Sequence, residues 1–275
     1  MRKLLSLLLA VSLLLGLCAP GNAEDAPALP LQGTDRLAIP VPQGWNVIRV
    51  DEEDEFSLTA IKGGSDLTSL VFNPSLSVMY VPLGTMVLDA RELTDTSEDI
   101  APFSLGGYDW TGYRYTAFGM SGISLTASGD FGTITAVVTP QGMMGGASIS
   151  LEDPDVQAIL AGITVKATVE ADWAVINEDG TLTVRLPGRE GFAWSTGMSG
   201  SFDLNGGENG PEGEVAEAEE DGVYTAVITL RGSGVFSQGF SLGNEDDEAA
   251  QARISVLCED GKAVALTDAA LSDAE

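Results

Sequence analysis

Short runs in which apolar residues occupy every second position, separated by glycine-rich turns, recur in both halves of the chain. In "TLTVRLPG" these positions are Leu182, Val184 and Leu186, and "VYTAVITLRG" repeats the pattern. Successive side chains of a strand point to opposite faces of a sheet, so this spacing is typical of strands with one buried face. Turns such as Gly-Asp-Phe-Gly supply the positive φ that tight hairpins need. The pattern therefore predicts antiparallel strands.

Two segments of the first half favour helices instead. "EDPDVQAILAGITV" sets Asp153 and Pro154 before apolar residues at helical spacing and ends at Gly162, which is the usual order of an N-cap, a first-turn proline and a glycine stop. Residues 85–100, "TMVLDARELTDTSEDI", are interpreted as a second helix. We therefore expect residues 35–170 to form an α+β domain, an antiparallel sheet with two helices.

The second half shows strand patterns and no helical one. We expect residues 171–275 to form an all-β immunoglobulin-like sandwich, joined to the first domain near the polar stretch at residues 166–172. Residues 203–222 are rich in glycine and carboxylates, which cannot bury apolar surface. They are predicted to form an excursion or a hairpin tip.

The first 23 residues have the order of a secretory signal peptide: Arg2 and Lys3, an apolar run, and then small residues ending at Ala23. Cleavage there would leave residues 24–34 as a linker rich in proline and small residues. Lipidation of Cys18 is the alternative, because "LLGLC" resembles a bacterial lipobox in which Leu17 replaces the usual small residue. No later stretch approaches the roughly 20 apolar residues of a membrane helix. We expect a secreted or cell-envelope protein.

Acidic residues dominate the charge of the chain. Aspartate and glutamate number 41 against 13 lysines and arginines, a formal net charge of -28. Such a surface repels nucleic acid, so a protein or peptide partner, or an envelope glycan, is expected instead. The acid-rich stretches at residues 51–55 and 244–250 could gather oxygen ligands for a structural calcium ion, but the sequence favours solvated loops. No other cofactor is expected.

The chain contains no histidine. This excludes Ser-His-Asp and Cys-His catalysis, and zinc and haem sites of the usual kind. Cleavage after Ala23 would leave Cys258 as a single cysteine, which cannot form an intrachain disulfide and is interpreted as a small buried residue. Its acidic neighbours, Glu259 and Asp260, do not favour a reactive thiolate. We expect no enzymatic activity.

Three segments of the first half, "IPVPQGW", "GGYDWTGYRY" and "ILAGITV", resemble the PsbP-like α+β sandwich of many exported bacterial lipoproteins. The resemblance covers about residues 35–166. It implies a shape rather than one chemistry, since that fold serves adaptors and binding proteins. The tyrosines of "YDWTGYRY" could stack on a sugar or a peptide. The resemblance favours their burial beneath helices, and alternation would set Tyr113 and Tyr115 on one face with Arg114 on the other.

In the second half, "GFAW" is similar to the Gly-aromatic-x-Trp end of the first inhibitory loop of chagasin-like cysteine protease inhibitors. "NGGENG" falls where the second loop would lie, and "VYTAVITLRG" leads to the third. Residues 187–190 depart from the family's Asn-Pro-Thr-Thr, and glycine and serine replace the Pro-Trp of its third loop. The resemblance implies these loop contacts: Gly191, Phe192, Trp194, Gly206, Gly207 and Arg231.

Core packing explains the same aromatic residues. Phe192 and Trp194 are two residues apart, so in a strand they share one face, and a sandwich core needs large aromatic side chains. The sequence favours this interpretation over a presented contact. Taken together, it predicts an exported acidic envelope protein that acts as a non-catalytic binding or interaction module. A chagasin-like inhibitor of papain-type cysteine proteases is the alternative.

Overall fold

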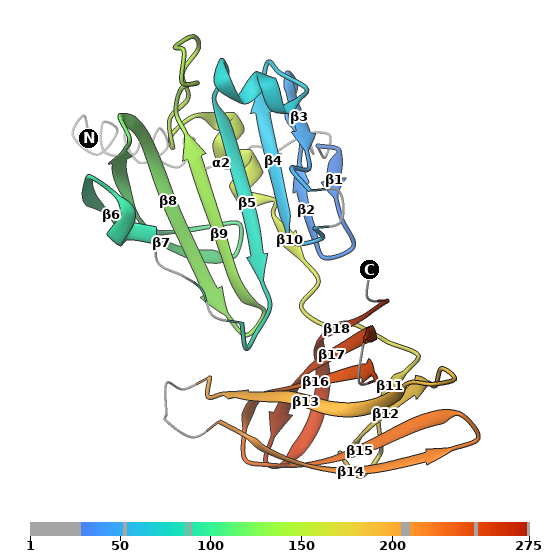
Figure 1. The fold of residues 1–275 in the computed structure, drawn as a ribbon. Coiled ribbons are helices and arrows are strands. Elements are labelled where there is room, and N and C mark those ends of the chain that lie inside the picture. Colours follow the sequence, from blue (N-terminus) through green and yellow to red (C-terminus); the bar gives the residue numbers. More distant parts are fainter. Residues whose placement is uncertain are drawn as a thin grey trace, which may run out of the picture. The chain divides into compact units, whose positions relative to one another are not determined.

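The computed structural model describes residues 29–51, 54–85, 87, 90–204, 210–244 and 247–273. The regular structure in these residues is nearly all β, with four antiparallel sheets and one α-helix (Figure 1). The expected α+β N-terminal domain with two helices is therefore wrong. The predicted signal peptide and Cys18 lie outside the described residues. Among the described residues, no helix is long and apolar enough to cross a membrane.

Buried apolar residues form two clusters, one between Leu37 and Ile163 and the other between Ala174 and Leu266. The elements around the first cluster are β1 (Leu31–Gly33), β2 (Leu37–Pro40), β3 (Trp45–Ile48), β4 (Ser57–Lys62), the 3-10 helix η1 (Leu67–Val71), β5 (Ser75–Val81), the 3-10 helix η2 (Ala90–Leu93), β6 (Thr96–Leu105), β7 (Tyr108–Ala117), β8 (Met120–Gly129), β9 (Gly132–Thr139), α2 (Pro154–Ala161) and β10 (Thr164–Val165).

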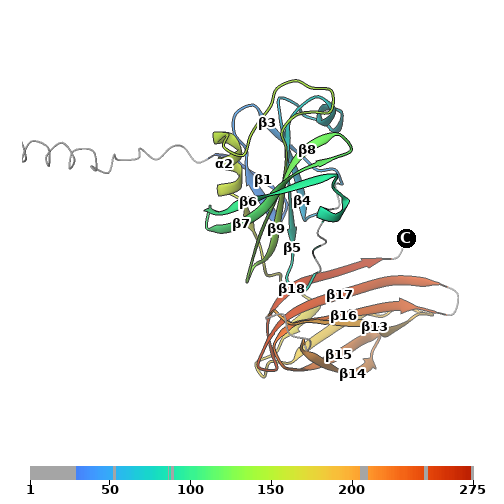
Figure 2. The same cartoon turned by 90° about the vertical axis from the view of Figure 1, so that its left-hand side faces the viewer.

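Seven of these strands form one antiparallel sheet in the order β3-β4-β5-β9-β8-β7-β6, and β1, β2 and β10 form a second. Buried and partly exposed residues alternate along β9 and the middle of β8, so one face of the large sheet is apolar. Helix α2 lies against that face (Figure 2). The side chains that β8, β9, β2 and α2 contribute to the cluster are Ile123, Leu125, Ala127, Ile134, Ala136, Val138, Leu37, Ile39, Val156, Ile159 and Leu160.

Helix α2 begins and ends where the sequence predicts, between Asp153 and Gly162, although Asp153 makes no side-chain capping hydrogen bond. The first turn is instead fixed through Asp155. The indole Nε1 of Trp45 donates to Asp155 Oδ2 at 3.0 Å, and Lys62 Nζ donates to the same oxygen at 3.0 Å. These contacts hold the pKa of the Asp155 carboxyl below its ordinary value. They connect the helix to β3 and β4.

The predicted helix at residues 85–100 is replaced by a short 3-10 turn and a strand. Residues 90–93 form η2, and β6 begins at Thr96 and pairs with β7 on both sides of an irregularity at residues 101–102. Seven of the ten β6 side chains are exposed. A strand at the edge of a sheet takes its hydrogen bonds from its neighbour and tolerates charged side chains. The second half of this predicted helix is therefore the edge strand of the sheet.

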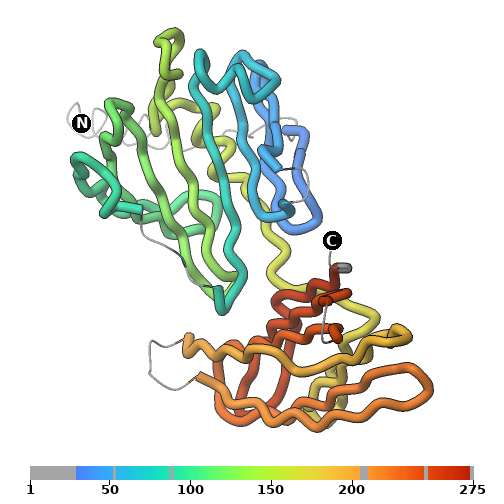
Figure 3. The backbone as a smooth tube through the Cα atoms, viewed as in Figure 1, coloured from blue at the N-terminus to red at the C-terminus, as the bar shows by residue number. Residues whose placement is uncertain are grey.

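The second cluster lies between two four-stranded sheets, ordered β11-β12-β15-β14 and β13-β16-β17-β18. If β11 is strand A, these orders are A-B-E-D and C-F-G, as in an immunoglobulin constant-type sandwich, with β18 as one further strand. Figure 3 follows the chain through them from yellow to red. Their bounds are β11 (Ala174–Ile176), β12 (Leu182–Pro187), β13 (Ala193–Phe202), β14 (Glu212–Glu220), β15 (Val223–Arg231), β16 (Gly234–Gly243), β17 (Glu248–Glu259) and β18 (Lys262–Asp273).

Cys258 is buried in this cluster, as the sequence predicts. Its Sγ donates to the carbonyl oxygen of Gly232 at 3.2 Å. Burial raises the pKa of the thiol, and nearby acidic residues act in the same direction. The side chain is therefore a protonated core residue.

Strand β14 occupies part of the segment that was predicted to be an excursion or a hairpin tip. It contains five glutamates among nine residues and pairs only with β15. Its register sets Glu217 opposite Ala226, and the Tyr224 hydroxyl donates to Glu217 Oε1 at 3.0 Å. At Gly213 a Cβ would come within 2.3 Å of the Phe236 ring, so the strand passes over that ring only because the residue is glycine.

Replacement of Asp155 by asparagine tests the connection between α2 and the sheet. Asparagine cannot provide the charged acceptor for Trp45 and Lys62, and we expect a loss of about 1 kcal/mol in the free energy of unfolding at pH 7. Because the pKa of Asp155 is lowered in the folded state, its contribution is complete above its unfolded pKa. The difference between wild type and variant should shrink as the pH falls below about 4. Urea denaturation at several pH values measures it.

The matched control is Asp130→Asn, at an exposed position in the turn between β8 and β9. It should leave the unfolding free energy nearly unchanged at every pH. Equal effects of the two substitutions at pH 7 would contradict the role given to Asp155.

Candidate functional site

Trp194 and Phe192, the aromatic pair of the predicted inhibitory loop, pack against the core of the sandwich. Trp194 is 8% exposed, its Nε1 donates to the carbonyl oxygen of Pro187 at 2.9 Å, and its ring lies 6.4 Å from that of Tyr224. Phe192 is partly buried against the same cluster. Gly191, with φ of +82°, lies in the turn before them. The structure thus gives Trp194 the core position that its spacing from Phe192 favours.

The other residues of the predicted contact surface do not join this loop. Strand β15 starts at Val223, opposite Pro187, and ends at Arg231, opposite Glu212. Eight strand steps of about 3.3 Å place Arg231 roughly 26 Å from the start of the strand. Gly191 and Arg231 therefore lie at opposite ends of β15. Gly206 and Gly207 lie outside the described residues.

The two acid-rich stretches considered for calcium, residues 51–55 and 244–250, are each only partly described. Within the described part of the chain, no group of three or more aspartate, glutamate, cysteine or histidine residues is arranged to hold a metal ion.

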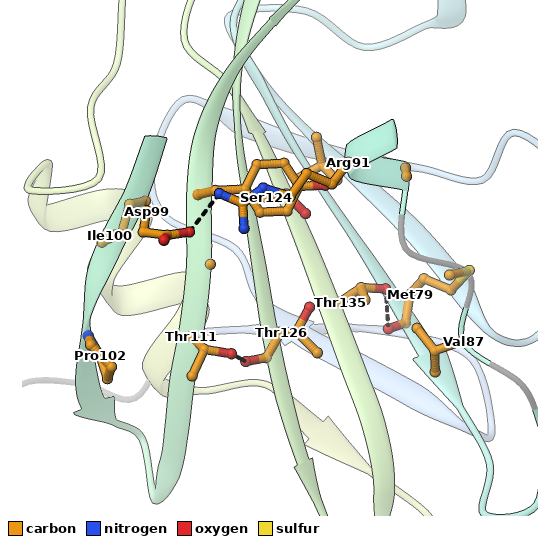
Figure 4. A pocket seen from close by; sticks show the side chains of 14 residues that line it. Met79, Val87, Arg91, Asp99, Ile100, Pro102, Thr111, Ser124, Thr126 and Thr135 are labelled. Atoms are coloured by element: carbon orange, nitrogen blue, oxygen red, sulfur yellow. Dashed lines mark hydrogen bonds and ion pairs between the residues drawn. The ribbon is translucent and has the colours of Figure 1, made fainter. Parts of the chain in front are cut away.

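A groove of about 660 Å³ lies on the face of the seven-stranded sheet that α2 does not cover. We call it the outer groove. Its floor is formed by β5, β9, β8 and β7, β6 flanks it on one side, and Val87 with the first residues of η2 forms another wall (Figure 4). The described residues that line it are Met79, Val87, Ala90, Arg91, Asp99, Ile100, Pro102, Thr111, Gly112, Tyr113, Ser124, Thr126, Thr135 and Val137.

A row of threonines crosses the floor of the outer groove. Strand register places Thr111 opposite Thr126, and Thr126 opposite Thr135, on three neighbouring strands. Thr111 Oγ1 donates to the Thr126 carbonyl oxygen and Thr135 Oγ1 to that of Met79, both at 3.4 Å, which is long for a hydroxyl donor. Within the described residues, no side-chain hydrogen bond engages Ser124 or Thr126. These hydroxyl groups can therefore bind a ligand.

The charged groups among the described lining residues pair with each other. Arg91 Nη2 donates to Asp99 Oδ1 at 2.6 Å, and Arg91 Nε donates to Ser97 Oγ at 3.0 Å. The guanidinium carbon also lies 4.8 Å from the centre of the Tyr113 ring. One positive and one negative charge leave this lining with no net charge. The Tyr113 ring is covered by the arginine rather than offered to a ligand.

A β-bulge shapes the β6 side of the outer groove. In the ladder with β7, Ile100 pairs with Gly112 and Phe103 with Trp110, so Ala101 and Pro102 both stand opposite Thr111. Two residues against one is the geometry of a bulge, which bends a strand and redirects its side chains. Pro102 lines the outer groove as a result.

The resemblance to a PsbP-like sheet implied that the tyrosines of β7 lie beneath helices. Tyr108 does pack against the first cluster beside Trp110, but Tyr113 and Tyr115 face away from α2. Trp110 is fully buried on the inner face, whereas Tyr113 and Tyr115 are partly exposed on the opposite face. The Tyr115 ring lies over Gly122, where a Cβ would come within 2.3 Å of it. The expected alternation is observed. What the sequence did not reveal is that the polar alternate positions of β7, β8 and β9 combine into one groove.

Comparisons of the chain with protein-family models, with curated proteins and with solved structures find no match. The resemblances to PsbP-like and chagasin-like domains therefore remain predictions from short motifs. Evidence about function must come from the site itself.

Substitution of Trp194 by alanine tests whether this side chain is a core residue. Removal of a buried tryptophan leaves a cavity and should lower the free energy of unfolding by about 3–5 kcal/mol. Urea denaturation, followed by circular dichroism, measures the change. The control is Met198→Ala in the same strand, where the side chain is 90% exposed and the expected change is below about 0.5 kcal/mol. Equal stability of the two variants would refute the core assignment.

Proposed function

We propose that the chain is an exported, acidic envelope protein that binds an uncharged ligand in the outer groove without chemically changing it. The observation that supports this proposal is the size of the outer groove together with the hydroxyl groups that line it. A groove of about 660 Å³ has the size of a small-molecule site, and its hydroxyl groups stand on central strands of a paired sheet. Such strands hold side chains more rigidly than loops do.

The composition of the outer groove supports binding rather than catalysis. Acid–base catalysis by carboxylates usually needs a second titratable group beside the first. Asp99 is 78% exposed and forms an ion pair with Arg91. Threonine and serine hydroxyls are weak nucleophiles without an adjacent base. A protein or peptide, or an envelope glycan, remains the expected class of partner.

The alternative, inhibition of papain-type proteases, receives little support from the second half of the chain. An inhibitor that contacts a protease through three loops would need the contact residues of those loops at one end of the sandwich. Gly191 and Arg231 lie at opposite ends of β15, and Trp194 is in the core. The immunoglobulin-type strand order alone carries no specific function.

Filling the outer groove should abolish binding. In Thr126→Phe the aromatic ring would occupy the middle of the hydroxyl row, and the neighbouring strands leave it no room to turn inward because Leu125 and Ala127 fill the other face. We expect wild type to retain ligands from a mixed array of glycans and uncharged peptides, and Thr126→Phe to lose them. Binding to the array is measured with labelled protein.

The matched control is Thr139→Phe, on the same face of β9 but outside the outer groove. It should retain every ligand that wild type retains. Both variants are first compared with wild type by circular dichroism. Full retention of all ligands by a folded Thr126→Phe protein would disprove the proposed site.

A further inference from the structure

We propose that the ligand of the outer groove is a neutral oligosaccharide, bound across the strands along the row of Thr111, Thr126 and Thr135. This inference rests on the proposed function and specifies its ligand. Five properties of the outer groove support it: its charge balance, the chemistry of its hydroxyl groups, the position of its apolar side chains, the pairing of its strand edges, and the spacing of its threonines.

The charge balance favours an uncharged ligand. Arg91 is already paired with Asp99 at 2.6 Å and stacked on Tyr113 at 4.8 Å. An anionic ligand would have to compete with Asp99 for the guanidinium, and it would approach a chain with a formal net charge of -28. A cationic ligand would meet one carboxylate that already has its partner. Among the described lining residues, neither an anionic nor a cationic ligand would meet an opposite charge that lacks a partner.

The hydroxyl groups match the groups of a sugar. Threonine and serine hydroxyls can each donate one hydrogen bond and accept two, as can every hydroxyl of a saccharide. Thr126 and Ser124 make no side-chain hydrogen bond with described residues, and the bonds of Thr111 and Thr135 are 3.4 Å long. A ligand that both donates and accepts can satisfy all four. A ligand with acceptors alone would leave the accepting capacity of these hydroxyls unused.

Apolar side chains line the same groove beside the hydroxyl row. Met79 is 44% exposed, and Val87, Pro102 and Val137 also belong to the lining. A pyranose ring presents hydroxyl groups at its rim and C–H groups on its faces, so it can contact hydroxyls and aliphatic side chains at once. Figure 4 shows Met79 and Val87 at one end of the groove and Pro102 at the other, with the threonines between them. An aliphatic molecule without hydroxyl groups would leave the floor unsatisfied.

The strand edges disfavour an extended peptide. Peptides commonly bind sheets by adding a strand to an open edge through backbone hydrogen bonds. The floor of the outer groove consists of β5, β9, β8 and β7, which are paired on both sides. The flanking edge strand, β6, is interrupted by the bulge and by Pro102, which has no N–H to donate. A peptide could not pair with the backbone of these strands, and its contacts would be limited to the side chains that line the groove.

The spacing of the row also suits a chain of sugar units. Thr111, Thr126 and Thr135 stand on consecutive strands, and neighbouring strands lie about 4.8 Å apart. This step is close to the length of one hexose unit in an extended polysaccharide. Successive units can therefore meet successive threonines.

The test uses isotope-labelled protein and three soluble probes in amide chemical-shift titrations at millimolar concentration. Cellotriose and triacetylchitotriose are neutral, and trigalacturonic acid is an anionic counterpart of similar length. We expect at least one neutral probe to shift the amide signals of residues 111, 126 and 135. Thr126→Val, which removes a hydroxyl without changing the size of the side chain, should raise the dissociation constant roughly three- to tenfold.

The matched control is Thr139→Val, the same substitution on the same sheet face outside the outer groove. It should bind the neutral probe as wild type does. The inference fails if neither neutral probe shifts these signals, if trigalacturonic acid binds as tightly as the neutral probes, or if both valine variants bind equally. Should an array peptide be retained by wild type and lost in Thr126→Phe, the saccharide is disproved while the binding function stands.

Discussion

Burial of the side chains on one face of β8 and β9 determines which side chains lie on the other face. Each residue that points into the first core, such as Leu125 or Ala136, forces its neighbours in the strand to the opposite face. Thr126 and Thr135 face the outer groove because the residues on either side of them are buried. A shift of one residue in either strand would bury these hydroxyls and expose the core. The outer groove and the hydrophobic core therefore depend on the same strand register.

The fold could be predicted wherever the sequence pattern is local. Alternation revealed β12 and β15, and the aspartate, proline and glycine around residues 153–162 gave the limits of α2. Prediction from sequence patterns failed at β6 and β14, two strands at sheet edges with mainly exposed side chains. Neither strand shows the apolar alternation that marks a half-buried strand. Each takes its conformation from hairpin hydrogen bonds with the next strand, across the turns at residues 106–107 and 221–222, and β14 also needs Gly213 to pass over Phe236. From composition alone, β6 resembled part of a helix and β14 resembled a loop.

The site was harder to predict than the fold. The two-residue spacing of Phe192 and Trp194 correctly favoured core packing for the tryptophan. The sequence does not reveal, however, that Arg231 and Gly191 lie a full strand apart. Their separation depends on how β15 pairs with β12 and β14. The outer groove needs Thr111, Thr126 and Thr135 in register on three strands, with η2 folded back beside them. Each threonine by itself looks like an ordinary strand residue.

The glutamates of β14 have a consequence for contacts between copies of the protein. An open strand edge is a template on which another chain can pair and begin to aggregate. A second copy that approached β14 with its own β14 would bring two rows of five carboxylates together. Glu217, opposite Ala226 and bonded to the Tyr224 hydroxyl, also places a charge where an added strand would need to pack. The acidity of this edge thus opposes self-association in concentrated solution, and salt should weaken that protection.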